Sequence, residues 1–268
     1  MDDLLHNVVD GNDEELLYFW AFGDLHYRAR DQWHAMHSRR FAPMFQDLRS
    51  LWLDEGPPDF CVSPGDIVDT GAPENYKLAK RDLAAQLGNI PFYPGIGNHE
   101  FHAESREDST HTAAEFSAIW DKPVRYTWTA GEVLCIMLDQ PDPYQPDPAR
   151  ENIHVIFSEE VRAILARHAN AVLYFSGHTH SGWGSPNLVF TEMLGGHPVN
   201  HVNLMSPWYT GVHRGPYLNT DRLRLDYHPD NPDVLATFAV RVYANTAIIR
   251  ARDHRARQWL TQWTAPLR

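Results

Sequence analysis

The chain has 268 residues, of which 43% are hydrophobic and 22% charged, and it contains nine tryptophans. This composition is that of a folded protein rather than a disordered one, and the length allows a sizeable core, so we expect a single α/β domain over residues 1–268. The formal net charge of −12 argues against a broad nucleic-acid-binding face, which needs a basic surface, so duplex nucleic acid is not an expected partner.

The sequence also bears on the cellular compartment. No apolar stretch is long enough to cross a bilayer, and the start, Met1 to His6, has neither the basic region nor the apolar core of a secretory signal. Cys61 and Cys135 lie inside apolar strand-like runs, which favours buried free thiols over a disulfide. We therefore expect a cytoplasmic protein with no membrane partner. The sequence leaves the oligomeric state open.

The first predicted elements are a strand and a long helix. Leu17 to Phe22 has the length and composition of a buried strand, and Asp24-Leu25-His26 follows it. The segment from Asp31 to Leu53 has apolar and aromatic residues at helical spacing and ends before Gly56, so it predicts a helix that packs against the sheet.

Two further strands end in the same way. Phe60-Cys61-Val62 precedes Gly65-Asp66-Ile67-Val68-Asp69, and Phe92-Tyr93 precedes Gly97-Asn98-His99-Glu100, with a crossover helix expected over Tyr76 to Leu87. Glycine lets the chain turn sharply at the edge of a sheet. The polar residues beyond each turn are therefore expected to converge in the crevice at the strand ends.

The second half of the chain is richer in strands. Thr112 to Trp120 predicts a third helix, near the mouth of the crevice, and 126–128 with 133–138 predicts a hairpin that turns at Ala130-Gly131. Val172 to Phe175 is a fourth strand-like run, and it precedes Gly177-His178-Thr179-His180. Further strands are expected over 188–190, 201–205, 234–242 and 247–249. Crossovers with helices followed by a strand-rich half are typical of an α/β fold in layers.

The four motifs together predict a metal site. They supply carboxylate and amide oxygen and imidazole nitrogen, which suit Mn, Fe, Zn or Ni better than a thiolate-seeking metal. Each motif alone has a structural alternative: Asp24 could cap the helix that starts near Arg30, Asn98 could occupy a left-handed turn, and His178 and His180 could be solvated loop residues. Their occurrence together, in this order and after strands, favours the metal site.

In these motifs and their order the chain resembles the calcineurin-like metallophosphoesterase superfamily, which includes Ser/Thr phosphatases, nucleases and class III cyclic-nucleotide phosphodiesterases. The resemblance spans about Tyr18 to His180. It implies a four-layer αββα fold, in which a sandwich of two β-sheets is flanked by helices. It also implies two divalent or mixed-valence metal ions as cofactors.

The resemblance further implies a role for each motif residue. The metal ligands it implies are Asp24, His26 and His180 for the first ion, Asn98 and His178 for the second, and Asp66 as the bridge between them. His99 matches the family histidine that contacts the phosphate or protonates the leaving oxygen. Asp69 matches the aspartate that orients this histidine.

One family feature is absent. A further metal-binding histidine, often within a His-His-Pro-Pro stretch, usually stands between the third and fourth motifs, and this chain has instead the proline-rich run Pro141 to Pro148. His154 is the candidate replacement, because it precedes a helix-like segment that leads into the last strand of the site. It begins the apolar run Val155-Ile156-Phe157 where the family ligand ends one, so a hydrogen-bonded core histidine is the alternative.

The expected function is metal-dependent hydrolysis of phosphate esters, with phosphodiesters of small molecules or nucleotides ahead of phosphomonoesters. A hydroxide that bridges the two ions is the expected nucleophile, and His99 is the expected general acid. Protein phosphatase activity is less favoured, because Asp69 is followed by Thr70-Gly71 where those enzymes have Arg-Gly. The alternative is a degenerate relative that binds fewer ions and serves as a regulatory module without turnover, which the short segment from Pro141 to His154 supports.

Several residues follow the motifs or strand ends and could flank the metals. An aromatic ring there could stack on a base, and an arginine could pair with a second phosphate oxygen, although packing at the rim of the site is an equal alternative. These residues are Tyr27, Arg28, Trp183, Trp208 and Tyr209.

Overall fold

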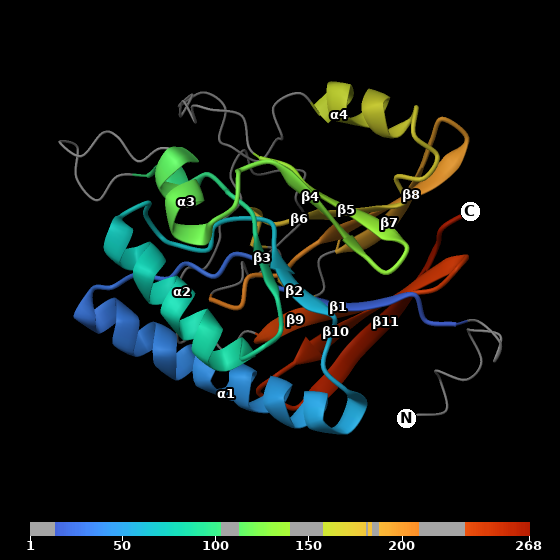
Figure 1. The fold of residues 1–268 in the computed structure, drawn as a ribbon. Helices are drawn as coiled ribbons and strands as arrows, with labels where there is room; N and C mark the ends of the chain where they lie inside the picture. The colour runs from blue at the N-terminus through green and yellow to red at the C-terminus, as the bar shows by residue number, and fades with distance from the viewer. Residues whose placement is uncertain (1–13, 103–112, 140–157, 181, 184–187, 209–233) are drawn as a thin grey trace, which may run out of the picture.

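The computed structural model describes residues 14–102, 113–139, 158–180, 182–183, 188–208 and 234–268. Its largest sheet has six strands (Figure 1). In spatial order they are β11 (Gln258–Pro266), β10 (Thr246–Asp253), β9 (Ala236–Val242), β1 (Leu17–Ala21), β2 (Phe60–Ser63) and β3 (Phe92–Pro94). The β1–β2 and β2–β3 pairs are parallel, whereas β9 pairs antiparallel with β1 and β10, and β10 pairs antiparallel with β11.

The remaining described strands form two smaller sheets. One contains β6 (Leu173–Ser176), β8 (His197–Asn203) and β7 (Val189–Leu194), with β6 parallel and β7 antiparallel to the central β8. The other is the hairpin of β4 (Tyr126–Ala130) and β5 (Val133–Met137). Figure 1 shows both on the same side of the six-stranded sheet.

Helices cover the outer faces. The long α1 (Asp31–Glu55) and α2 (Pro73–Leu87) lie along the far side of the six-stranded sheet, and α4 (Ser158–Leu165) lies beyond the three-stranded one (Figure 1). The short α3 (Ala113–Trp120) contacts α2. This order of layers confirms the predicted α/β fold with two β-layers flanked by helices, the second layer being made of the three-stranded sheet and the hairpin.

The first strand shows why the layers form. Side chains alternate between the two faces of a strand, so Tyr18 and Trp20 enter the core under α1 and α2, whereas Leu17, Phe19 and Ala21 enter the core between the sheets. Because β1 is buried on both faces, its sequence is a continuous apolar run.

The predicted elements compare closely with the described ones. The first helix ends at Glu55, two residues beyond the prediction, where Gly56 takes a φ of 88° that glycine adopts without steric cost. Strand β11 was not predicted, because glutamine and threonine dilute the apolar content of this half-buried edge strand. Cys61 and Cys135 are free thiols, as predicted, but only Cys61 is buried, whereas Cys135 is partly exposed. The helices in the described part of the chain are all too short or too polar to span a bilayer.

A buried polar network fixes α1 on the sheet. Asp47 accepts hydrogen bonds from Arg252 Nε and Nη2 at 2.9 and 2.8 Å, and its Oδ2 lies 2.8 Å from His254 Nδ1. His254 Nε2 lies 2.7 Å from Thr237 Oγ1, which also accepts a hydrogen bond from Trp20 Nε1. The network is consistent with a neutral His254 that donates to Asp47 and accepts from Thr237. Burial lowers the pKa of His254, which also favours the neutral ring.

Candidate metal centre

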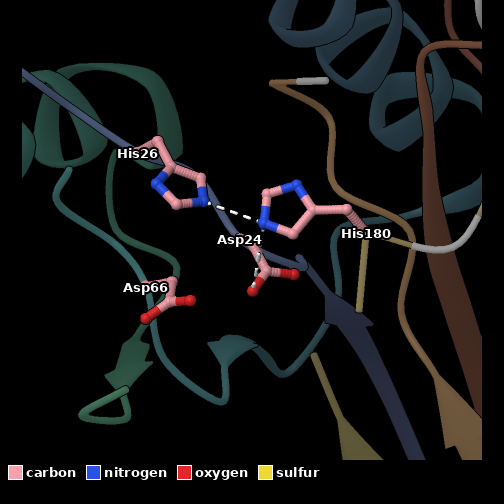
Figure 2. Close-up of side chains that lie close together, drawn as sticks. All are labelled: Asp24, His26, Asp66 and His180. Atoms are coloured by element: carbon pink, nitrogen blue, oxygen red, sulfur yellow. Dashed lines mark hydrogen bonds and ion pairs between the residues drawn. The ribbon is translucent and has the colours of Figure 1, made fainter. Parts of the chain in front are cut away.

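Four polar residues that follow three strands meet at one edge of the fold. Asp24 and His26 follow β1, Asp66 follows β2, and His180 follows β6. One ligand atom from each of these four buried residues lies within 4.8 Å of the others. Figure 2 shows the two imidazole rings turned toward each other beside the two carboxylates.

Unusual backbone conformations turn the side chains inward. His26, Asp66, His178 and His180 have φ values of 50°, 51°, 73° and 47°, in the left-handed region that residues other than glycine rarely adopt. Each such residue costs on the order of 1–3 kcal/mol, so the surrounding structure must hold it in place. The backbone N–H groups of Leu25 and His26 do so in part, because both donate to the Asp66 carbonyl, at 2.9 and 3.0 Å.

Two motif glycines leave room for the carboxylates. A Cβ at Gly177 would lie 2.9 Å from Asp24 Oδ2, and a Cβ at Gly97 would overlap Asp66 Oδ1. Any larger residue at either position would displace a carboxylate of the cluster.

The spacing of the donor atoms fits a metal ion. His26 Nε2 and His180 Nε2 are 3.0 Å apart, and His180 Nε2 is 3.8 Å from Asp24 Oδ1. With metal–nitrogen bonds of about 2.0–2.1 Å, two adjacent ligands of one ion lie about 2.9–3.4 Å apart. The distance between the two histidine nitrogens lies within this range, and the Asp24 oxygen lies about 0.4 Å beyond it. Asp24 Oδ2 is buried and has no hydrogen-bond partner among the described residues. An orphaned buried carboxylate oxygen beside converging ring nitrogens is what a cation site requires.

A second pair of donors adjoins the first cluster. Asn98 Oδ1 lies 2.8 Å from His178 Nδ1. The His178 main-chain N–H donates to Asp24 Oδ1 at 2.6 Å, and the His99 main-chain N–H donates to Asp66 Oδ1 at 2.9 Å, so the pair is tied to both carboxylates. The structure thus brings together all the expected ligands except one: His154 lies outside the described residues.

The electrostatics of the cluster also favour a bound cation. The pKa of Asp66 is raised well above its usual value, by burial first and then by the charges of Asp24 and Glu100. The pKa of His26 is lowered well below its usual value, by burial and by His99 and His180. A cation at this place would stabilise the carboxylates and the neutral imidazoles together.

Glu100 holds two of the motif loops together, a role that the sequence analysis missed. Its buried carboxylate accepts four main-chain hydrogen bonds of 2.7–3.1 Å, from Gly97, Asp66, Ile67 and Val68. Burial raises its pKa to about 7 despite these bonds. The available signal was its place in the third motif, directly after His99.

His99 is oriented by the main chain of Asp69. His99 Nδ1 lies 2.8 Å from the Asp69 carbonyl oxygen, which can only accept, so Nδ1 carries the proton. The Asp69 carboxylate instead accepts a hydrogen bond of 2.7 Å from Arg28 Nη1 and lies 3.8 Å from His26 Nδ1. Burial lowers the pKa of His99, and Asp69 opposes this shift.

The residues expected to flank the metals have mixed positions. Trp208 is buried and packs against Trp33 and His37, with ring centroids 5.2 and 5.0 Å apart, and Tyr27 is also buried, so both belong to the core. Trp183 is 41% exposed. Tyr209 lies outside the described residues. The ring of His102, which had no predicted role, lies 4.5 Å from that of His99.

Comparisons with known proteins agree with this geometry. Residues 17–182 match the model of a family described as calcineurin-like phosphoesterase. No curated relative matches the chain.

The solved structures that match this chain share little sequence with it. A conserved protein of Streptococcus pneumoniae, described as a predicted phosphoesterase, is 12% identical, with a TM-score of 0.46 over 93% of this chain and 97% of that one. Vps29 of Entamoeba histolytica, in complex with Zn²⁺, is 14% identical, with a TM-score of 0.44 over 94% and 100%. Vacuolar protein sorting 29 of Cryptosporidium parvum is 11% identical, with a TM-score of 0.45 over 94% and 98%.

Proposed function

The chain belongs to the calcineurin-like phosphoesterase family, and from that premise we propose that it hydrolyses phosphodiesters of small molecules or nucleotides at a centre of two metal ions. Metal-dependent phosphoester hydrolysis is the activity that the family match and the candidate metal site support together. The observation that carries the proposal is the convergence of Asp24, His26, Asp66 and His180, four buried donors from distant parts of the chain.

Each set of donors has a place in this proposal. Asp24, His26 and His180 would hold one ion, Asn98 and His178 would hold the other, and Asp66 would contact both. Their oxygen and nitrogen atoms suit Mn, Fe, Zn or Ni. Bound ions would neutralise charge on the phosphate and activate the attacking water.

His99 is the proposed general acid. Its Nδ1 donates to the Asp69 carbonyl, so Nε2 is the nitrogen that would serve the leaving oxygen. Donation from Nε2 requires the doubly protonated ring, because Nδ1 keeps its own proton for the carbonyl. A negatively charged substrate beside the ring would favour that form. General-acid catalysis of this kind contributes about a hundred- to ten-thousand-fold in rate.

The loop after Asp69 supports a diester rather than a monoester. Thr70 occupies the position of the arginine of the Ser/Thr phosphatases, and it is buried with its hydroxyl 2.8 Å from Asn75 Nδ2. The neighbouring Arg28 is engaged by Asp69. Thr70 carries no charge, and the positive charge of Arg28 is paired with Asp69, so neither side chain is placed to neutralise the second negative charge of a phosphomonoester. A diester carries only one negative charge.

The test compares two chromogenic esters on protein loaded with Mn²⁺, namely bis(p-nitrophenyl) phosphate and p-nitrophenyl phosphate. We expect faster diester hydrolysis, its loss on chelation, and a fall in kcat of about a hundred- to ten-thousand-fold in His99→Ala with metal content retained. His168→Ala, an exposed histidine beyond α4, is the matched control. Fewer than two ions per chain and no turnover of either ester would favour the regulatory module, and an unchanged rate in His99→Ala would refute the assigned acid.

A further inference from the structure

We propose that Arg28 is a positioning residue of the metal centre, which anchors the Asp69 carboxylate beside His26 so that Asp69 supports a metal ligand rather than the general acid. This inference rests on the proposed function, because it takes His26 as a ligand. It gives Asp69 a different task from the one that the family resemblance implies.

The two nitrogens of His26 face different partners. Nε2 points into the cluster, 3.0 Å from His180 Nε2, whereas Nδ1 lies 3.8 Å from Asp69 Oδ1. A histidine that binds a metal through one nitrogen usually presents the other N–H to a carboxylate or carbonyl, which fixes the ring and raises its basicity as a ligand. The Asp69 distance exceeds an N–H···O bond of about 3.0 Å by about 0.8 Å, so the carboxylate approaches Nδ1 closely without forming a direct hydrogen bond.

Arg28 fixes the other oxygen of the same carboxylate. Its Nη1 donates to Asp69 Oδ2 at 2.7 Å, and only 17% of the Arg28 side chain and 12% of the Asp69 side chain are exposed. A charge-assisted bond with so little exposure is stronger than an ordinary surface ion pair. With Oδ2 held by Arg28, Oδ1 is left on the side of His26.

Trp33 joins Arg28 to the backbone of His26. The Arg28 guanidinium carbon lies 5.5 Å from the centre of the Trp33 ring, within the range of a cation–π contact, and Trp33 Nε1 donates to the His26 carbonyl at 3.1 Å. The first turn of α1 therefore braces the ligand and its supporting carboxylate together.

The orientation of His99 does not depend on this carboxylate, although the carboxylate lies within 4.8 Å of a His99 nitrogen and its charge raises the pKa of His99. Its Nδ1 is engaged by the Asp69 carbonyl, and the Asp69 main chain is itself held, because its N–H donates to the Tyr27 carbonyl at 2.9 Å and Val68 forms a bridge with Tyr27. Asp69→Asn keeps all of these main-chain bonds. The carboxylate can therefore be removed without releasing the proposed acid.

The experiment measures Mn²⁺ binding by calorimetry on protein stripped with a chelator, for the wild type, Arg28→Gln, Asp69→Asn and the double variant. We expect each single variant to weaken the binding of one ion by about 10–100-fold, as loss of a ligand's outer partner does. The double variant should be no weaker than the singles, because both act on His26 in series. Arg28→Lys should recover part of the affinity. Arg125→Gln, which breaks the exposed ion pair with Asp139, is the control.

The rival assignments give different results. If Asp69→Asn keeps its Mn²⁺ affinity but loses kcat and shifts the pH profile, Asp69 serves His99 and the proposal is wrong. If Arg28→Gln keeps its affinity and raises only KM, Arg28 contacts the substrate and the proposal is equally wrong. Should Arg28→Gln fail to fold, Asp69→Asn and Arg28→Lys decide the matter. A wild type that binds no Mn²⁺ overturns the proposed function itself, whereas a wild type that binds and hydrolyses beside unaffected variants overturns this inference alone.

Discussion

The buried His37 on α1 makes stability depend on pH in a way that one substitution should remove. Its side chain is 1% exposed, packs on Phe41 with ring centroids 3.9 Å apart, and places Nε2 2.8 Å from the Leu25 carbonyl, between two expected ligands. Because that oxygen can only accept, Nε2 of His37 carries a proton. Burial lowers its pKa from 6.5 to about 3, despite the hydrogen bond to Leu25.

The sign and size of the effect follow from linkage. Above pH 6.5 His37 is neutral in both states and its contribution is fully present. As the pH falls from 6.5 toward 3, the unfolded state takes up a proton that the folded state refuses, so the free energy of unfolding drops by about 1.4 kcal/mol per pH unit from this residue alone. At pH 4.5 the loss is about 3 kcal/mol.

His37→Gln keeps a donor for the Leu25 carbonyl but cannot titrate. We expect the variant to be less stable than the wild type by about 1–3 kcal/mol at pH 7, since the ring packing is lost, and the difference to shrink by about 3 kcal/mol between pH 6.5 and 4.5. The assay is urea unfolding followed by tryptophan fluorescence, with a chelator present so that metal binding does not contribute. His168→Gln is the exposed control, with a difference that stays constant. A wild-type-minus-His37→Gln difference that is the same at pH 7 and pH 4.5 would refute the reasoning.

Three further substitutions test the polar network around Asp47, the space that Gly177 leaves for the Asp24 carboxylate, and the hydrogen bonds by which Glu100 joins two motif loops. Burial alone would raise the pKa of Asp47, but the hydrogen bonds from Arg252 and His254 lower it to about 2. Asp47→Asn leaves the Arg252 guanidinium, whose side chain is only 11% exposed, without its carboxylate, and should cost about 3 kcal/mol of unfolding free energy at pH 7. Gly177→Ala should displace the Asp24 carboxylate and weaken Mn²⁺ binding at least about tenfold. Glu100→Gln replaces one of the two accepting oxygens with an NH2 group, which leaves two of the four main-chain donors without an acceptor, and it should destabilise the fold by about 2 kcal/mol or more.

Each of these has its own control or contrary result. The exposed Asp54→Asn, on the same helix as Asp47, should change stability by less than about 0.5 kcal/mol. An Asp47→Asn loss no larger than that would mean that the network contributes little. Unchanged Mn²⁺ affinity in Gly177→Ala would show that the loop can shift away from Asp24. A fully stable Glu100→Gln would mean that water replaces the lost acceptor.

The strand ends and their motif residues could be predicted because they depend on local pattern. An apolar run followed by glycine and a polar residue predicts both a buried strand and the point at which the chain leaves the sheet. Strand β1 with Asp24 and strand β2 with Asp66 are examples. Parallel neighbours in one sheet then bring these ends together.

Long-range partners could not be predicted from the pattern. Asp47, Thr237 and His254 meet across about two hundred positions, and no periodicity relates them. His99 pairs with the carbonyl of Asp69, whereas the Asp69 carboxylate pairs with Arg28. This division of partners depends on how the folded chain places Arg28 beside Asp69. Strand β11 was missed because an edge strand needs fewer apolar residues than a central one.

Anomalous X-ray scattering from crystals of Mn²⁺-loaded protein would locate the ions directly. We expect two peaks on either side of Asp66, one between the Nε2 atoms of His26 and His180 and one beside Asn98 and His178. A single peak, or peaks away from these side chains, would contradict a centre of two metal ions at the strand ends.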